Sequence, residues 1–168
     1  RFLVLLLISV CLVLFFARLG DIPLYDNDEG IHAVTSKDMV LSGDWVTTTF
    51  NGEPFYDKPV LYNWFAAIAF LIFGFTEFAA RLPAALLGLG SVLVTYALGR
   101  RFGGPMLGFL GGMILATSPE FITLSRAVIH DISLVFFVTL TLCLFYYGFT
   151  AGTRRKWYFL PFYAATGF

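Results

Sequence analysis

The stretch FAARLPAALLGLGSVLVTYALG, residues 78–99, is apolar and long enough to cross a lipid bilayer as a helix. Other apolar blocks flank it along the chain: Phe2–Phe16, Val60–Phe75, Gly103–Leu124, Ile132–Phe149 and Trp157 to the end. The 168 residues are 58% hydrophobic and 18% aromatic, with a mean hydropathy of +0.80, far outside the range of soluble domains. The composition therefore predicts an all-α, polytopic transmembrane helical bundle in contact with membrane lipids, without a nucleic-acid partner.

The first apolar block has the length of a signal peptide, but Arg18-Leu19-Gly20 follows it instead of a small-residue cleavage site. We therefore favour a retained membrane helix over a cleaved signal. The chain begins with Arg1 and stops at Phe168 inside an apolar run. We expect residues 1–168 to be the N-terminal transmembrane part of a longer protein.

Charge predicts the topology. If Val60–Phe75 does not span the bilayer, the basic clusters Arg100-Arg101 and Arg154-Arg155-Lys156 face the cytoplasm, as the positive-inside rule prefers, and all acidic residues face outward. If this block spans, both basic clusters face outward. The first alternative predicts that residues 19–75 form an extracytoplasmic loop with juxtamembrane helices.

Within this loop, a helix is expected to begin at Asp28 and to end at Gly43, with apolar residues on one face: Ile31, Val34 and Leu41. Asn51-Gly52 predicts a turn, and Lys58-Pro59 predicts an extended junction into the next helix.

Three groups of polar residues on the outer side are candidates for chemistry. Asp26-Asn27-Asp28-Glu29 holds three carboxylates, which suit a general base or a divalent cation, or merely favour a helix start. Lys58, at headgroup depth, could bind a lipid phosphate through its ammonium group. The alternative is a lysine at a helix end that only extends its ammonium group to water. In residues 125–131, Arg126, His130 and Asp131 are costly at membrane depth unless they are paired or face a wet cavity, so they are candidates for function. The alternative is an Arg126–Asp131 ion pair that only shapes the turn.

Several short motifs span nearly the whole chain: Asp28-Glu29-Gly30, Ser42-Gly43-Asp44-Trp45, Asn51-Gly52, Tyr56-Asp57-Lys58-Pro59, Ala80-Arg81-Leu82-Pro83, and Ser125-Arg126 with Asp131. With these motifs in this order, the chain resembles membrane glycosyltransferases of the GT-C type. It is similar to the branch with protein O-mannosyltransferases and lipid A aminoarabinose transferases. The resemblance implies a polyprenyl-phosphate-linked sugar donor, a lipid, glycan or protein acceptor, and an integral protein of the bacterial inner membrane whose site faces the periplasm or exterior.

The resemblance also implies residue roles: Asp28 as the principal catalytic carboxylate with Glu29 beside it, Lys58 at the carrier phosphate, and Asp131 as the second acidic residue. A glycosyl phosphate already carries a good leaving group, so catalysis needs a base and cations that hold the departing phosphate. We predict catalytic roles for Asp28 and Asp131 and substrate binding by Glu29, Lys58 and Arg126. No histidine pair has ligand spacing, and the need for a divalent cation stays open.

The chain departs from the family at three positions. The family often has proline where Val60 and His130 stand, and the aminoarabinose branch has tyrosine where His32 stands. These departures leave the sugar and the acceptor open. A transporter or a membrane scaffold without an active site are the alternatives. A transporter predicts charges inside helices, whereas here the acids lie in loops at one surface.

Overall fold

The computed structural model describes residues 2–24, 28–150 and 155–167. Its helices, in chain order, are α1 (Phe2–Cys11), the π-helical η1 (Leu12–Phe16), α2 (Asp28–Ser42), α3 (Leu61–Phe73), α4 (Glu77–Thr117), α5 (Pro119–Arg126), α6 (Asp131–Thr150) and α7 (Arg155–Thr166). The described strands are β1 (Thr49–Phe50) and β2 (Glu53–Pro54), which pair antiparallel. The predicted all-α fold is confirmed.

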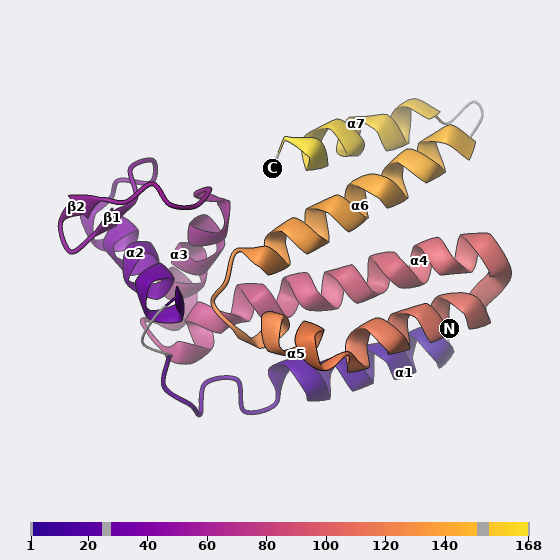
Figure 1. The fold of residues 1–168 in the computed structure, drawn as a ribbon, viewed down its shortest axis with the longest axis horizontal. Helices are drawn as coiled ribbons and strands as arrows, with labels where there is room; N and C mark the ends of the chain where they lie inside the picture. Colours follow the sequence, from indigo (N-terminus) through magenta and orange to yellow (C-terminus); the bar gives the residue numbers. More distant parts are fainter. Residues whose placement is uncertain (1, 25–27, 151–154, 168) are drawn as a thin grey trace.

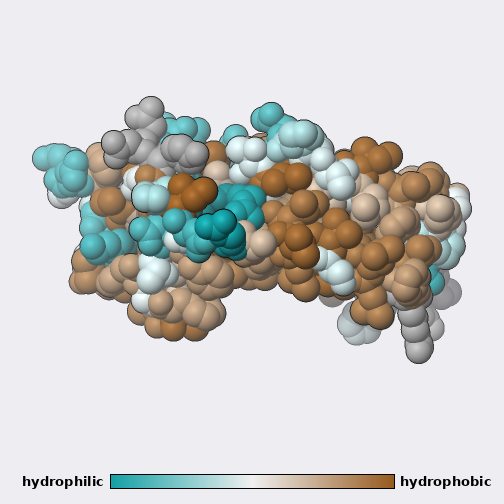
Figure 2. All heavy atoms as spheres, turned by 90° about the horizontal axis from the view of Figure 1, so that it is seen from below, coloured by the Kyte–Doolittle hydropathy of each residue, from teal (hydrophilic) through white to brown (hydrophobic). Residues whose placement is uncertain are grey.

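The long helices lie side by side, and α2, α3 and the small hairpin gather at one end of them (Figure 1). Among the described residues, α4 and α6 are long and apolar enough to cross a membrane, whereas the apolar segments Phe2–Phe16 and Leu61–Phe73 are shorter. Apolar residues cover much of the long-helix part, and hydrophilic residues gather near α2 and α3 (Figure 2). We call the end of the molecule formed by α2, α3 and the hairpin the polar end.

Helix α4 consists of two arms joined by a sharp break. Gly104 has a φ of 87°, which is open to glycine but strained for other residues, and Gly103 is also non-helical. Beyond the break the chain turns back, so that Gly108 lies against the backbone of Tyr96 and Arg100 in the first arm. The two arms are separate helical segments that lie against each other, as the two separate apolar blocks at Phe78–Gly99 and Gly103–Leu124 predicted.

The expectation of one helix through Gly103–Leu124 was wrong. The second arm ends at Thr117, and Ser118 is extended with a φ of −66° and a ψ of 123°. Residues before a proline are pushed out of the helical region, and Pro119 begins the separate helix α5. The break directs the end of α5 toward the polar end of the bundle.

Helix α3 is too short to span the bilayer upright. Its 13 residues rise by about 20 Å, against about 30 Å of hydrocarbon. It packs with α2 at the polar end, while Arg100 and Arg101 lie beside the α4 break at the other end (Figure 1). This arrangement agrees with the topology in which Val60–Phe75 is interfacial. Arg1, Asp26-Asn27, Arg154 and the side chains of residues 155–156 lie outside the described part.

Helix α2 begins and ends as predicted but buries a different face. Val34 and Leu41 are 37% and 65% exposed. The buried face is mostly polar or small: Glu29, His32, Ala33, Thr35, Ser36 and Met39. The expected apolar face at Ile31, Val34 and Leu41 was therefore wrong, because α2 turns its polar residues toward the interior. Ser36 Oγ, for instance, lies 3.3 Å from Oδ1 of Asn63 in α3.

The turn at Asn51-Gly52 is confirmed. Asn51 and Gly52 have φ angles of 53° and 82°, which are those of a tight two-residue hairpin turn. Thr48 donates its hydroxyl to the carbonyl of Phe55, which closes the base of the hairpin. The chain then leads through Lys58 and Pro59 into α3, and this path places the lysine at the edge of the polar end.

Candidate active site

A buried ion pair organises the polar end. Arg81 of α4 donates hydrogen bonds to both carboxylate oxygens of Glu29, at 3.1 and 2.8 Å. The guanidinium also donates to backbone carbonyls of the segment after η1, at Leu19, Ile22 and Pro23. The backbone N–H of Val128 donates to Oε1 of Glu29 at 2.8 Å. The pair thus joins the segment before α2, the start of α2, α4 and the loop before α6.

The pair is almost completely enclosed, with Glu29 4% and Arg81 5% exposed. Buried charges are tolerated when they are paired and their remaining donors and acceptors are satisfied, as they are here. Because Asp28 immediately precedes Glu29, the pair also fixes where the exposed Asp28 side chain stands.

Two histidines meet next to this pair. The rings of His32 in α2 and His130 before α6 have centroids 4.3 Å apart. Tyr62 of α3 packs on His130 at 5.2 Å and donates its hydroxyl to the carbonyl of Ala80 at 3.3 Å. Residues far apart in sequence therefore form one aromatic cluster under the surface.

A pocket of about 240 Å³ opens beside this cluster. Its polar lining comes from Lys58, His130, Asp131 and Ser133. Its apolar lining comes from Pro59, Leu61, Tyr62, Leu134 and Phe137. Nζ of Lys58 lies 3.9 Å from the carboxylate of Asp57, and both side chains are about half exposed. The ammonium is therefore free to turn toward a ligand in the pocket.

Charged groups from several elements act on the pKa of His32. Burial lowers the pKa of His32 most strongly. The negative charges of Asp28, Asp57 and Asp131 act against this shift, and the positive charge of Lys58 adds to it. One ring thus feels charges from α2, from the segment before α3 and from the start of α6.

The pKa of His130 is lowered to about 4, first by burial and then by the nearby His32 and Lys58. The Asp57 carboxylate and the Pro59 carbonyl act against this shift, because both favour the charged form. His130 is therefore neutral at pH 7, and the imidazole presents one N–H donor and one acceptor nitrogen.

This depressed pKa predicts acid instability. Between the ordinary pKa of 6.5 and about 4, the unfolded chain binds a proton that folded His130 does not. Its contribution to stability is complete above pH 6.5 and falls as the pH drops toward 4. We expect the thermal unfolding midpoint to fall over this range, and to fall less steeply in His130→Gln. Parallel pH curves for the two proteins would contradict the assignment.

Three predicted site residues do not line this pocket: Asp28, Glu29 and Arg126. Arg126 donates to the carbonyls of Leu14 and Ala17 at 2.9 and 3.0 Å, and it lines a separate pocket beside Glu29 and Arg81. Within the described residues, no ion pair joins Arg126 to Asp131. The substrate-binding roles of Glu29 and Arg126 stay predictions, and their contacts show that both residues stabilise the fold.

Some residues at the site received no role from the sequence. Arg81 was quoted only as part of a motif, although a lone arginine inside an apolar block is a signal that it has a buried partner. His32 gave no signal, because a single histidine in a polar helix is common. Within the described residues, no cluster of three or more histidine, cysteine, aspartate or glutamate side chains is placed to hold a metal ion.

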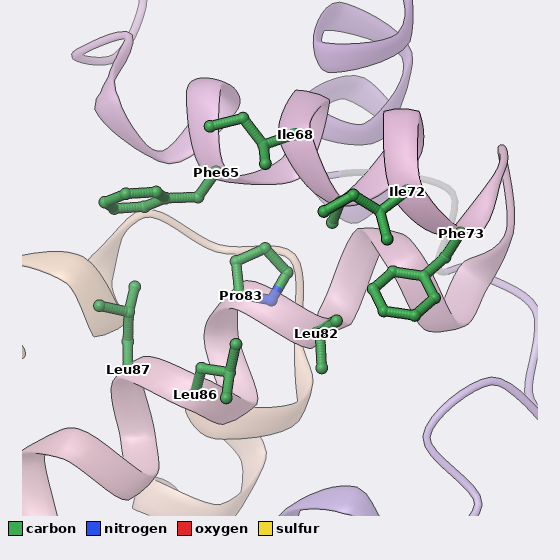
Figure 3. A pocket seen from close by; sticks show the side chains of 9 residues that line it. Phe65, Ile68, Ile72, Phe73, Leu82, Pro83, Leu86 and Leu87 are labelled. Carbon is green, nitrogen blue, oxygen red and sulfur yellow. The ribbon is translucent and has the colours of Figure 1, made fainter.

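A larger cavity of about 570 Å³ lies between α3 and α4 (Figure 3). Its lining is entirely apolar, from Phe65, Ile68, Ala69, Ile72, Phe73, Leu82, Pro83, Leu86 and Leu87. Without a polar side chain, this cavity suits hydrocarbon rather than reacting groups. It begins about one helical turn along α3 from Leu61 and Tyr62 of the polar pocket.

The chain is similar to known membrane proteins. The model of the family described as dolichyl-phosphate-mannose-protein mannosyltransferase matches residues 57–168. An undecaprenyl phosphate-alpha-4-amino-4-deoxy-L-arabinose arabinosyl transferase of Pseudomonas aeruginosa (strain UCBPP-PA14) is 31% identical over 92% of this chain and 29% of its own length. The corresponding protein of Aeromonas salmonicida (strain A449) is 35% identical over 61% of this chain and 19% of its own length.

A solved structure is also similar. The crystal structure of ArnT from Cupriavidus metallidurans bound to undecaprenyl phosphate has a TM-score of 0.90 and 30% identity, covering 98% of this chain and 31% of that one. The chain thus spans about a third or less of the length of these relatives. Because the family model matches most of the chain, the protein belongs to the dolichyl-phosphate-mannose-protein mannosyltransferase family of polyprenyl-phosphate-sugar-dependent, GT-C-type glycosyltransferases.

Proposed function

We propose that this chain forms the donor-binding part of a glycosyltransferase. The enzyme moves a sugar from a polyprenyl-phosphate carrier to a lipid, glycan or protein acceptor. The observation that carries this proposal is the gathering of Asp28, Lys58 and Asp131 around the His32–His130 pair. Lys58 and Asp131 line one small pocket and supply a cation and an acid, and Asp28 supplies a base whose charge acts on the neighbouring His32.

The reaction is a direct displacement. The oxygen of the acceptor hydroxyl forms a bond to the anomeric carbon, and the bond from that carbon to the phosphate oxygen breaks. The electron pair leaves with the carrier phosphate, whose negative charge the Lys58 ammonium stabilises. Asp28 takes the acceptor proton, and Asp131 orients the acceptor or shares a proton with Asp28. Attack opposite the leaving group inverts the anomeric carbon.

The apolar cavity between α3 and α4 fits the carrier's hydrocarbon chain. The polar pocket and this cavity share α3, so a phosphate at Lys58 and a chain along α3 are compatible with one lipid. A donor seated in this way enters from the membrane and presents its sugar at the polar end. We infer that this end faces the periplasm or exterior of a bacterial inner membrane, because Arg100 and Arg101 lie at the opposite end.

A transporter fits the structure less well. Arg81 stands inside the apolar part of α4. Its guanidinium donates its hydrogen bonds to Glu29 and to backbone carbonyls. An arginine bonded in this way is not available to line a substrate path.

Binding of the carrier provides the test. In the full-length protein, Lys58→Ala is expected to weaken the binding of undecaprenyl phosphate by about 10- to 100-fold, the loss of one charge-assisted hydrogen bond. Lys58→Arg should restore part of the affinity. Binding is measured by titration of the purified protein in detergent.

Lys37→Ala is the matched control, because Lys37 is an exposed lysine of α2 that lies over the ring of Phe75 and does not line the Lys58 pocket. Equal affinities of Lys58→Ala and wild type would contradict the proposed phosphate site.

A further inference from the structure

The polar pocket contains two buried side chains whose polar atoms lack a well-formed hydrogen bond. His130 and Ser133 are each 8% exposed. Neither ring nitrogen of His130 makes a well-formed hydrogen bond within the described structure, and neither does Oγ of Ser133. Buried polar atoms are nearly always paired, so unpaired ones that line a pocket point to a ligand.

Both groups belong to one rigid element. His130 directly precedes α6, and the backbone N–H of Ser133 donates to the His130 carbonyl at 2.9 Å. The first turn of α6 therefore holds the imidazole and the hydroxyl in the same pocket wall as Asp131, with Lys58 also in the lining. From this placement, and resting on the proposed function, we propose that His130 and Ser133 form a subsite that hydrogen-bonds the sugar of the donor.

The size of the pocket limits its occupant. At about 240 Å³ it is smaller than the roughly 300–1,000 Å³ of sites for drug-sized ligands, so it holds about one ring and not a polyprenyl chain. With the carrier phosphate at Lys58, two groups are near enough to enter it: the sugar and the first isoprene unit. An isoprene unit has no hydrogen-bonding atoms and would leave His130 and Ser133 unpaired. The sugar is therefore the better occupant.

The chemistry of the two groups matches hydroxyls. A neutral imidazole and a serine hydroxyl each donate one hydrogen bond and accept another, as a sugar hydroxyl does. The groups that face His130 are His32 from α2, Tyr62 from α3, and the segment before α3 with the Asp57 and Lys58 side chains and the Pro59 carbonyl. A site that leaves buried polar groups unpaired with the wrong ligand discriminates strongly against that ligand. His130 and Ser133 are thus specificity-determining residues.

The test compares two probes on the full-length protein: undecaprenyl phosphate, and the same carrier joined to a sugar, either mannose or 4-amino-4-deoxy-L-arabinose. Wild type is expected to bind at least one sugar-bearing carrier more tightly than undecaprenyl phosphate. His130→Phe and Ser133→Ala are each expected to weaken that binding by about tenfold, the loss of one hydrogen bond, and to change undecaprenyl phosphate binding less than twofold.

Ser125→Ala is the matched control. Oγ of Ser125 is also buried and unpaired, but it packs against Gly88 outside the pocket, so its removal should affect neither probe. Because Ser133→Ala removes a single oxygen, it keeps the test valid if His130→Phe does not fold. Equal losses for both probes, no loss for either, or a wild type that does not distinguish them would overturn the subsite. Unchanged undecaprenyl phosphate binding in Lys58→Ala would instead count against the proposed function.

Discussion

Replacing Asp28 with asparagine is expected to lower kcat for sugar transfer by about 10²- to 10⁴-fold, the usual contribution of a general base. Asparagine keeps the size of the side chain but cannot accept the acceptor proton. Because Asp28 is exposed and does not line the Lys58 pocket, the affinity for undecaprenyl phosphate and the unfolding temperature should stay near those of wild type. The measurement is transfer of a radiolabelled sugar by the full-length protein in proteoliposomes.

Asp38→Asn serves as the control for this experiment, because Asp38 also stands on α2 but, unlike Asp28, is not among the charges that act on His32. Its rate should match that of wild type. If Asp28→Asn transferred sugar as fast as Asp38→Asn, Asp28 would not be the base, and the assignment of the reaction to this end of α2 would fail.

Replacing Arg81 with methionine should destabilise the protein severely. The change leaves the Glu29 carboxylate buried without its cation, and it also removes the donors to the carbonyls of Leu19, Ile22 and Pro23. Breaking a buried pair by removing one partner costs about 3–5 kcal/mol. We expect a lower unfolding temperature in detergent and a lower yield of folded protein.

Two further variants separate the charge from the packing. Arg81→Met combined with Glu29→Gln removes the unpaired charge and should recover part of the lost stability. Arg126→Met should cost less than Arg81→Met, because Arg126 is only half-buried and donates to two carbonyls. If Arg81→Met were no less stable than Arg126→Met, the ion pair would not organise the polar end.

The fold was largely predictable because transmembrane helices are governed by long apolar blocks. The blocks at Phe78–Gly99 and Ile132–Phe149 correspond to the first arm of α4 and to α6. The predicted buried face of α2 was wrong, because this helix lies outside the long apolar blocks. Helix α2 buries His32 and Ser36 and exposes Leu41, so its buried face cannot be found by looking for apolar residues.

The site was predictable in part. The resemblance and the outer-side charges predicted that Asp28, Lys58 and Asp131 come together, and the charges acting on His32 agree with this. The sequence could not show that Glu29 and Arg126 are held in other contacts, because the bonds of Glu29 to Arg81 and of Arg126 to a backbone carbonyl depend on tertiary packing. His130 was a candidate from its cost at membrane depth, but its contact with His32 required the structure.

The bonds made by Arg81 also determine how the polar end can deform. One guanidinium fastens the segment after η1 to the start of α2, and Glu29 extends the connection to Val128, three residues before Asp131. The two carboxylates proposed to act in catalysis, Asp28 and Asp131, are therefore both close in sequence to residues that this ion pair joins. Lys58 stands in a different segment, between the hairpin and α3. We therefore expect a shift of this segment to move Lys58 without changing the spacing of Asp28 and Asp131.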